Sequence, residues 1–362
     1  NPLEGIDRVT NIYDFVGKVL HTRTVHHAGQ SGEKIVTRKF DYDHAGRLLK
    51  TWHRIGGSGN FKLLAANEYN ELGQLITKKL HSENGGSTFE QEVDYRYNIR
   101  GWLTKVNDPA NIGNDLFGMQ LKYNDPTLAN TTPQFNGNIS QIDWKSVDGE
   151  SQQYGYKYDP MNRLREANYF NQTSPNKNNR FDEKISGGYD LNGNILGISR
   201  NGKIGEQNHG QMDNLTFTYS GNQLLKVGES ASAAYGFKDG ANTDNDYLYD
   251  HNGNMILDKN KDIDGATSST GNSMITYNYL NLPEVVRKNT GEYIKYIYDA
   301  TGRKLRQEVY NASNQLIKKS VYAGEFFYEG ENPAGNATAS LKFVNTEEGR
   351  VLLDGTSQEY QY

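Results

Sequence analysis

Closely spaced oxygen-bearing side chains are the most suggestive chemical feature of this sequence of 362 residues. In the segment from Asp258 to Gly265, Asn260, Asp262 and Asp264 stand at alternate positions directly before a glycine. An EF-hand calcium loop begins in this way, with oxygen ligands at positions 1, 3 and 5 and glycine at position 6. The glutamate of position 12 is absent and no helical pattern flanks the segment, so we interpret it as a solvated acidic turn and keep calcium as the alternative.

The other reactive side chains do not form the constellation of an enzyme. The sequence has no cysteine, which excludes disulfides, thiolate zinc sites and thiol nucleophiles. His26 and His27 are adjacent, so they point to opposite faces of a strand, and His44, His53 and His81 fall in separate segments. No His-Glu-x-x-His, Gly-x-Ser-x-Gly or phosphate-loop motif is present. We therefore expect no enzymatic activity and no cofactor.

Composition narrows the class of protein further. Hydrophobic residues make up only 35% of the chain, which contains 38 glycines and 25 tyrosines. No apolar run of about 18 residues could form a membrane-spanning helix. The net charge of −5 gives no electrostatic reason to expect nucleic acid as a partner. An aromatic content of 11% is unlike that of a disordered chain. A soluble, turn-rich β protein is what these numbers predict.

A short unit, Tyr-Asp/Asn-x-x-Gly-x-aliphatic, recurs along the chain. Successive tyrosines of the unit often lie 27 to 30 residues apart, which is the spacing of a repeat protein. Its characteristic positions are Tyr13, Gly17, Tyr42, Asp43, Gly46, Tyr69, Gly73, Tyr97, Gly101, Tyr158, Asp159, Tyr189, Asp190, Gly193, Tyr249, Asp250, Gly253, Tyr298, Asp299 and Gly302.

Each repeat is predicted to form a strand, a turn and a second strand. Residues alternate in character before the turn, the acidic or amide residue can bond its own backbone, and glycine supplies the positive φ that closes a bulged hairpin. We expect one long antiparallel sheet in which the tyrosine rings pack on neighbouring repeats; binding of sugar or protein by exposed rings is the alternative. The longest gap between repeats, Asp108 to Gln134, is interpreted as an inserted loop.

The repeat unit and its period resemble the RHS/YD-repeat family over nearly all 362 residues. The segments 249–283 and 344–350 carry the resemblance especially clearly, and in such proteins the second usually stands just before the RHS core segment. The resemblance implies an all-β fold, a repetitive antiparallel β-hairpin strip that spirals into a hollow shell. It also implies that residues 1–362 form a single RHS/YD region that is incomplete at both ends, without the core and the C-terminal domain. The family's self-cleaving residues therefore correspond to nothing here.

These observations lead to one expected function and an alternative. The resemblance implies a non-catalytic bacterial shell that encloses or presents a polypeptide, as part of an exported toxin or effector. The alternative is a cell-surface scaffold or adhesin that binds glycan or protein, or a component of an outer-membrane secretion system of the type IX kind. The expected partners are the protein's own C-terminal polypeptide cargo, or secretion-machinery and surface proteins, with a glycan as a further candidate. The expected location is extracellular or at the cell surface.

Overall fold

A computed structural model describes residue 3 and residues 5–28, 32–231, 234–240, 244–265, 274–354 and 357–362. These residues form two compact units. Unit 1 comprises residues 1–91 and 249–362, and unit 2 comprises residues 92–248. Both consist of antiparallel strands, so the all-β fold class is as expected. Among the described strands, however, pairing is interrupted after residue 229 and after residue 258, so the prediction of one continuous sheet is wrong. Whether the chain is a single repeat region stays a prediction.

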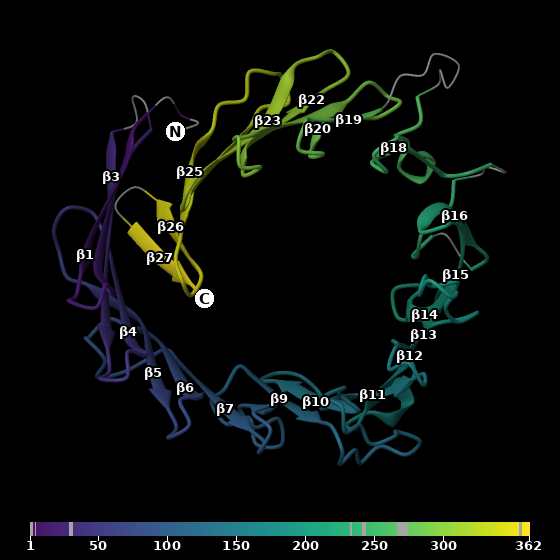
Figure 1. The fold of residues 1–362 in the computed structure, drawn as a ribbon, viewed down its shortest axis with the longest axis horizontal. Coiled ribbons are helices and arrows are strands. Elements are labelled where there is room, and N and C mark those ends of the chain that lie inside the picture. The colour runs from purple at the N-terminus through teal and green to yellow at the C-terminus, as the bar shows by residue number, and fades with distance from the viewer. Residues whose placement is uncertain are drawn as a thin grey trace. The chain divides into compact units, whose positions relative to one another are not determined.

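Unit 1 contains strands from both ends of the chain. In its first part each strand pairs with the next, and Figure 1 shows these strands in purple to blue. They are β1 (Asp7–Tyr13), β2 (Val19–His27), β3 (Glu33–Tyr42), β4 (Leu48–Ile55), β5 (Lys62–Tyr69) and β6 (Leu75–Ser82). The second part, in green to yellow, contains β18 (Met255–Asp258), β19 (Ile275–Tyr277), β20 (Pro283–Arg287), β21 (Tyr293–Tyr298), β22 (Lys304–Tyr310), β23 (Leu316–Ala323), β24 (Phe326–Glu331), β25 (Ser340–Asn345), β26 (Arg350–Asp354) and β27 (Ser357–Gln361).

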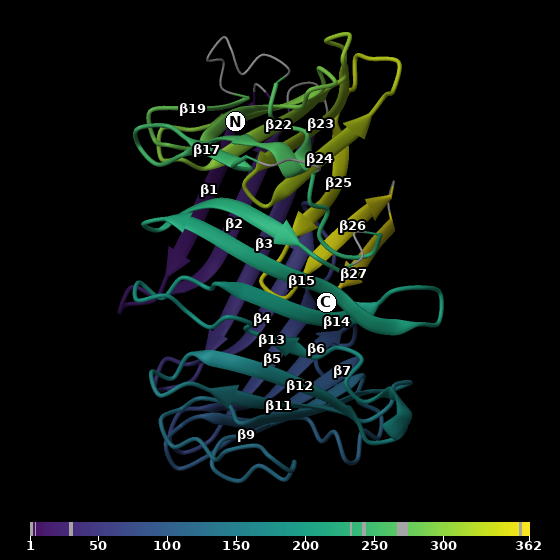
Figure 2. The same ribbon diagram turned by 90° about the vertical axis from the view of Figure 1, so that its right-hand side faces the viewer.

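Unit 2 repeats the same arrangement, and its strands lie side by side in Figure 2. They are β7 (Gln91–Tyr97), β8 (Leu103–Val106), β9 (Phe117–Lys122), β10 (Gln141–Ser146), β11 (Gln152–Tyr158), β12 (Leu164–Asn171), β13 (Glu183–Lys184), β14 (Gly197–Lys203), β15 (His209–Ser220) and β16 (Gln223–Glu229). The strand β17 (Tyr247–Tyr249) spans the boundary between the units.

Helical structure in the described chain is limited to the two 3₁₀ turns η1 (Pro175–Lys177) and η2 (Lys259–Lys261). None of the described helices is long and apolar enough to cross a membrane.

The segment Asp108–Gln134 is not simply an inserted loop, contrary to the prediction. It contains β9, which pairs with β10 over six consecutive residue pairs, from Gln141 with Lys122 to Ser146 with Phe117. It also pairs with β8 through Lys105 and Val106. A Tyr123-Asn124 pair follows this strand as in the other repeats, but residue Thr127 stands where the motif has glycine, so the repeat motif is incomplete. Backbone pairing with both neighbours determines its conformation instead.

The repeat turns share one hydrogen-bond pattern. In the turn at Asp159, Oδ1 accepts bonds from the backbone N–H groups of Met161 and Arg163, both at 2.9 Å. The pairing register shifts by one residue next to the repeat tyrosine, for instance at Tyr42, as in a bulged hairpin. The glycine position has a φ of 80° in Gly46, and Asn162 takes the same left-handed conformation with a φ of 62°.

The tyrosine hydroxyls connect successive repeats. In most repeats the hydroxyl donates to the backbone carbonyl six residues after the tyrosine of the previous repeat, across 2.6–3.0 Å. The rings therefore pack along the strip, and each hydroxyl reaches the backbone of its neighbour. These bonds join Tyr42 to Val19, Tyr69 to Leu48, Tyr123 to Leu103, Tyr189 to Leu164, Tyr219 to Ile195, Tyr277 to Met255 and Tyr298 to Pro283.

Removing one of these hydroxyls is expected to cost about 1 kcal/mol of unfolding free energy, the usual net contribution of one hydrogen bond. The test is Tyr69→Phe, which removes the 2.8 Å bond to the Leu48 carbonyl while the 3.1 Å bond from Asn67 Nδ2 remains, followed by urea unfolding. The matched control is Tyr279→Phe, because Tyr279 is 81% exposed. Equal losses in the two variants would contradict a stabilising role for the tyrosine ladder.

Candidate functional site

A cluster of buried apolar residues in unit 1 lies where the C-terminal strands of the unit pack on its N-terminal sheet. Figure 1 shows β25–β27 in yellow beside the purple and blue strands. One apolar cluster joins the two parts: Ala28 and Val36 from the N-terminal sheet contact residues of β23, β24 and β25. The C-terminal members are Val321, Ala323, Phe326, Tyr328 and Val344. We call this junction of β23–β27 with β2–β6 the seam.

Three histidines form a column along the seam. His26, His53 and His81 lie on β2, β4 and β6 and are 27 and 28 residues apart, so they recur at about the repeat period on alternate strands. Each contacts a tyrosine hydroxyl of the C-terminal strands or the residue after them. The pairs are His26 Nε2 with Tyr328 at 2.8 Å, His53 Nδ1 with Tyr360 at 3.2 Å, and His81 Nδ1 with Tyr362 at 2.5 Å.

His26 is fully enclosed and bonded at both ring nitrogens. Its Nδ1 lies 2.6 Å from Oδ1 of Asp7 on β1, and its ring stacks on Phe326 with 4.1 Å between the ring centroids. An Asp–His pair beside a hydroxyl resembles the activating half of a catalytic triad. Because His26 has no exposed surface, a substrate cannot reach it. The arrangement therefore orients side chains inside the seam.

His53 differs from His26 in having an incomplete set of partners. It is also fully enclosed, and within the described chain its Nε2 atom is buried without a hydrogen bond. Burial lowers the pKa of His53 to about 3, and the nearby Arg38 guanidinium contributes to the shift. The imidazole is therefore neutral at pH 7, and protonating it would place a second positive charge beside Arg38.

Acid is expected to weaken the seam through His53. The pKa of His53 is lower in the folded state than in the unfolded one. The contribution of the neutral imidazole to the unfolding free energy is therefore complete above pH 6.5 and declines as the pH falls toward about 3. At pH 5 the loss in unfolding free energy would be about 2 kcal/mol. The measurement is urea unfolding at pH 7 and pH 5 for the parent, His53→Gln and His44→Gln. His53→Gln should reduce the difference between the two pH values; the idea fails if the exposed His44 gives the same reduction.

The turn that follows β25 adds charged contacts to the seam. It belongs to the segment 344–350 that carries the family resemblance. The Arg38 guanidinium pairs with Glu325 and, from Nε at 2.6 Å, with Glu347. Next to it, Lys78 Nζ lies 2.8 Å from Oε2 of Glu348. Burial opposes the charge on Arg38, yet the two carboxylates raise its pKa. The turn therefore connects β25 to both β3 and β6.

Gly349 has a steric role in this turn. A Cβ atom built at Gly349 would lie 2.0 Å from the backbone oxygen of Gln361, so only glycine allows β27 this close. The same turn is closed by a 2.8 Å bond from the Thr346 N–H to the Gly349 carbonyl. The glycine thus permits the turn and the last strand to lie against one another.

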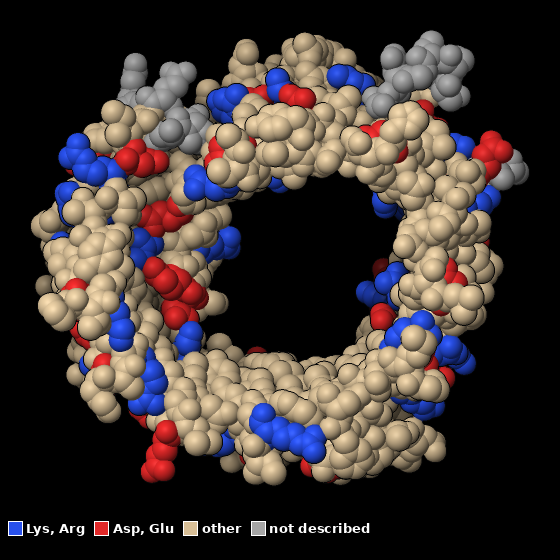
Figure 3. All heavy atoms as spheres, viewed as in Figure 1, with Lys and Arg blue, Asp and Glu red and all other residues tan. Residues whose placement is uncertain are grey.

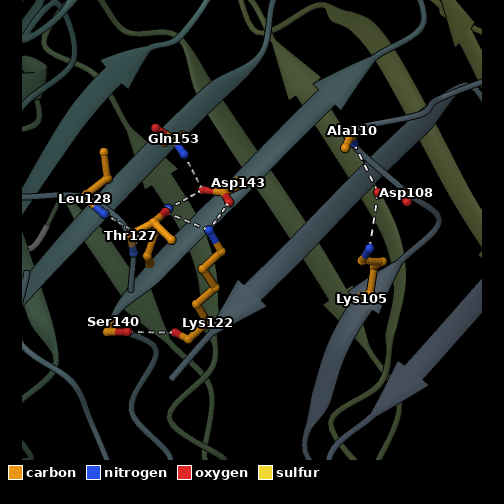
Figure 4. A network of polar contacts seen from close by, with 10 residues as sticks. Lys105, Asp108, Ala110, Lys122, Thr127, Leu128, Ser140, Asp143 and Gln153 are labelled. Carbon is orange, nitrogen blue, oxygen red and sulfur yellow. Dashed lines mark hydrogen bonds and ion pairs between the residues drawn. The ribbon is translucent and has the colours of Figure 1, made fainter. Parts of the chain in front are cut away.

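A polar network in unit 2 anchors the segment between β9 and β10, as Figure 4 shows. Gln141 is fully buried, and its Oε1 accepts bonds from the backbone N–H groups of Thr127 and Leu128 at 2.8 and 2.9 Å. Asp143 accepts from the Gln153 side chain at 2.8 Å and pairs with Lys122 at 2.6 Å. Because its members bond one another, the network fixes the segment on the sheet.

The calcium candidate has one of its two carboxylates, that of Asp264, engaged within the protein. The carboxylate of Asp264 bonds the Asn289 amide, and Asn289 Oδ1 accepts from the N–H groups of Asp264 and Gly265. Asp262 is in a left-handed conformation at the end of η2. Among the described residues no group of three or more His, Cys, Asp or Glu side chains could hold a metal ion. Calcium at Asn260, Asp262 and Asp264 therefore stays a prediction without support from the geometry.

The histidine column is not predicted from the sequence, in which His53 and His81 lie in separate repeats. The available signal was the spacing of the three histidines, 27 and 28 residues, which is close to the repeat period. Their tyrosine partners, more than 280 residues away along the chain, carried no comparable signal. Figure 3 shows acidic and basic side chains interspersed among neutral ones, in keeping with the mild net charge.

Comparison of this chain with known proteins identifies similar folds among solved structures. No family model and no curated protein matches the sequence. The chain is similar to chains in crystal structures of TcdB2-TccC3-Cdc42 and TcdB2-TccC3, with TM-scores of 0.56 and 0.54 and 15% identity in both. A Tc holotoxin pore structure from Photorhabdus luminescens gives 0.55 and 15%.

These matches cover 96–98% of this chain but only 17–18% of the other chains. The chain therefore spans less than a fifth of the length of the structures that it resembles. At this identity the likeness concerns the fold: the β-shell fold class expected from the sequence is confirmed, and it is the fold seen in toxin-complex chains.

Proposed function

We propose that this chain is a non-catalytic RHS/YD-repeat shell region that encloses or presents a polypeptide, as part of an exported toxin or effector. The observation that carries the proposal is the likeness to TcdB2-TccC3 chains over 96–98% of its length. The chemistry of the seam is consistent with it. The enclosed histidines and the paired charges stabilise packing and expose no nucleophile to a substrate.

The hydrogen-bond pattern explains how such a region could serve as a wall. Within β1–β6, within β7–β16 and within β19–β27 each strand bonds to the next, and the tyrosine hydroxyls add a second connection between repeats. A sheet connected in this way resists local opening, because one strand cannot leave without breaking bonds to both neighbours. The expected partner is a segment of the same polypeptide, and the expected location is outside the producing cell.

The test is protease protection in the polypeptide as its gene encodes it. We expect a segment outside residues 1–362 to resist proteinase K while the repeat region is folded, and to be cut once urea unfolds it. That segment, expressed alone in bacteria, should arrest growth. If the full polypeptide has no protected segment, the proposed container function is wrong and the function as a surface scaffold is favoured. A protected segment that leaves growth unaffected would overturn the toxin assignment alone.

A further inference from the structure

We propose that unit 2 carries a binding site for a neutral sugar ring beside the turn at Tyr97–Gly101. A hollow of about 280 Å³ opens there, which we call the Trp102 pocket. Its size is near the lower end of small-molecule sites, roughly 300–1,000 Å³, and suits one ring of an oligosaccharide. The pocket is lined by Asn98, Ile99, Arg100, Trp102, Asn124, Gln134 and Phe135.

This turn differs from several other repeat turns at one position. In those turns the acidic or amide residue bonds the side chain four residues later, as in Asn70 with Gln74 at 2.9 Å and Asp190 with Asn194 at 2.8 Å. Here the fourth residue is Trp102, which offers no acceptor to Asn98. Asn98 Oδ1 still accepts the turn's two backbone N–H bonds, from Arg100 at 2.9 Å and Trp102 at 3.0 Å. Its Nδ2 group therefore has no hydrogen-bond partner in the described structure, and Asn98 lines the pocket.

Apolar surfaces form the walls of the pocket. The Trp102 ring lies 5.0 Å from the Tyr123 ring, and the Arg100 guanidinium is 5.0 Å from the Trp102 ring centroid, so the indole is held in place. Phe135 is 65% exposed and Ile99 is fully exposed. Exposed apolar surface next to a held aromatic ring is typical of a ligand-binding site. The C–H face of a sugar ring packs well on such a surface.

The polar groups around these walls are neutral amides. Asn124 has no side-chain hydrogen bond within the described residues, and Gln134 uses only Nε2, which donates to the Thr132 carbonyl at 3.2 Å. Amides both donate and accept, and sugar hydroxyls do the same. The one charged group, Arg100, already donates from Nη1 to the Phe135 carbonyl at 2.6 Å. The combination favours a neutral sugar over an anion, which would need an uncommitted cation.

The test measures binding of maltohexaose, cellohexaose, xylohexaose and chitohexaose to the full chain by isothermal titration calorimetry. At least one is expected to bind. Phe135→Ala should weaken binding about tenfold, because it removes an apolar wall on which the sugar ring packs. Since the Phe135 ring is exposed, its removal should leave the protein folded. Asn98→Asp should weaken it by a similar factor, since aspartate preserves the turn, as at Asp159, but has no donor. The matched control, Leu191→Ala at another fully exposed turn position, should bind as the parent does.

Two outcomes would overturn the proposal. One is the absence of saturable binding by all four sugars below about 10 mM. The other is unchanged binding in a folded Phe135→Ala variant, which would place the sugar elsewhere. Circular dichroism of each variant separates loss of binding from loss of fold. The result is independent of the container function, because a shell that encloses a protected segment could have this pocket or lack it.

Discussion

Replacing Arg38 by methionine is expected to lower the unfolding free energy by about 3–5 kcal/mol. The Arg38 side chain is 9% exposed and pairs with Glu325, whose side chain is 16% exposed, and with Glu347. Taking a carboxylate out of water is costly, and the guanidinium offsets that cost. Arg38→Met would leave Glu325 buried without its cation, so unit 1 would lose stability where β3 meets the turn after β25. Urea unfolding followed by circular dichroism measures the change.

Two further variants distinguish a buried charge from simple loss of packing. Arg47→Met removes an ion pair with Asp43 at 2.6 Å whose arginine is 32% exposed, and should cost about 1 kcal/mol or less. The double variant Arg38→Met/Glu325→Gln should recover a large part of the loss, because the buried negative charge is removed together with its partner. The explanation is wrong if Arg38→Met costs no more than Arg47→Met, or if Glu325→Gln brings no recovery.

Phe326→Ala is expected to be about as destabilising, with a loss of about 3–5 kcal/mol. Phe326 is only 2% exposed, and it stacks on His26 within the cluster that joins the two parts of unit 1. Truncation would remove apolar contacts and leave a cavity that the surrounding strands cannot close, since both sheets are held by backbone pairing. Thermal and urea unfolding of the variant measure the loss.

Phe15 offers a control with the same substitution. It is fully exposed at the tip of the first repeat turn, so Phe15→Ala should change the unfolding free energy by less than about 0.5 kcal/mol. In Phe326→Ala, strands β25–β27 should also exchange amide hydrogens faster than β20–β22, because the seam holds the former. Uniform acceleration across unit 1 would show that the seam does not open separately.

The repeat architecture could be predicted because its signals are local. A tyrosine, an acidic or amide residue and a glycine within five positions specify a bulged turn, as the bonds of Asp190 illustrate. Alternation of residue types on either side specifies the strands. The strand β9 was not predicted for the same reason: the Tyr123-Asn124 pair after it lacks the glycine of the motif, and pairing with β8 and β10 identifies the strand.

The seam and the pocket could not be predicted in this way. His53 and Tyr360 are 307 residues apart, and nothing in either segment specifies the other. The Trp102 pocket depends on how the segment after β9 returns to the turn at Asn98, which the network around Gln141 determines. The departure at Trp102 is visible in the sequence, but its meaning depends on the neighbours that the fold supplies.

The sequence by itself determined the hairpin repeat, its period and the all-β class, because turn chemistry and strand alternation act over a few residues. Tertiary structure alone decided which repeats meet across the seam and where the Trp102 pocket opens. It also decided that Arg38 pairs with Glu347 and Lys78 with Glu348. Those outcomes depend on pairing register summed over many strands and on side chains far apart in the chain. The physical reason is that contacts between distant segments are selected by the packing of the whole unit, which no local pattern encodes.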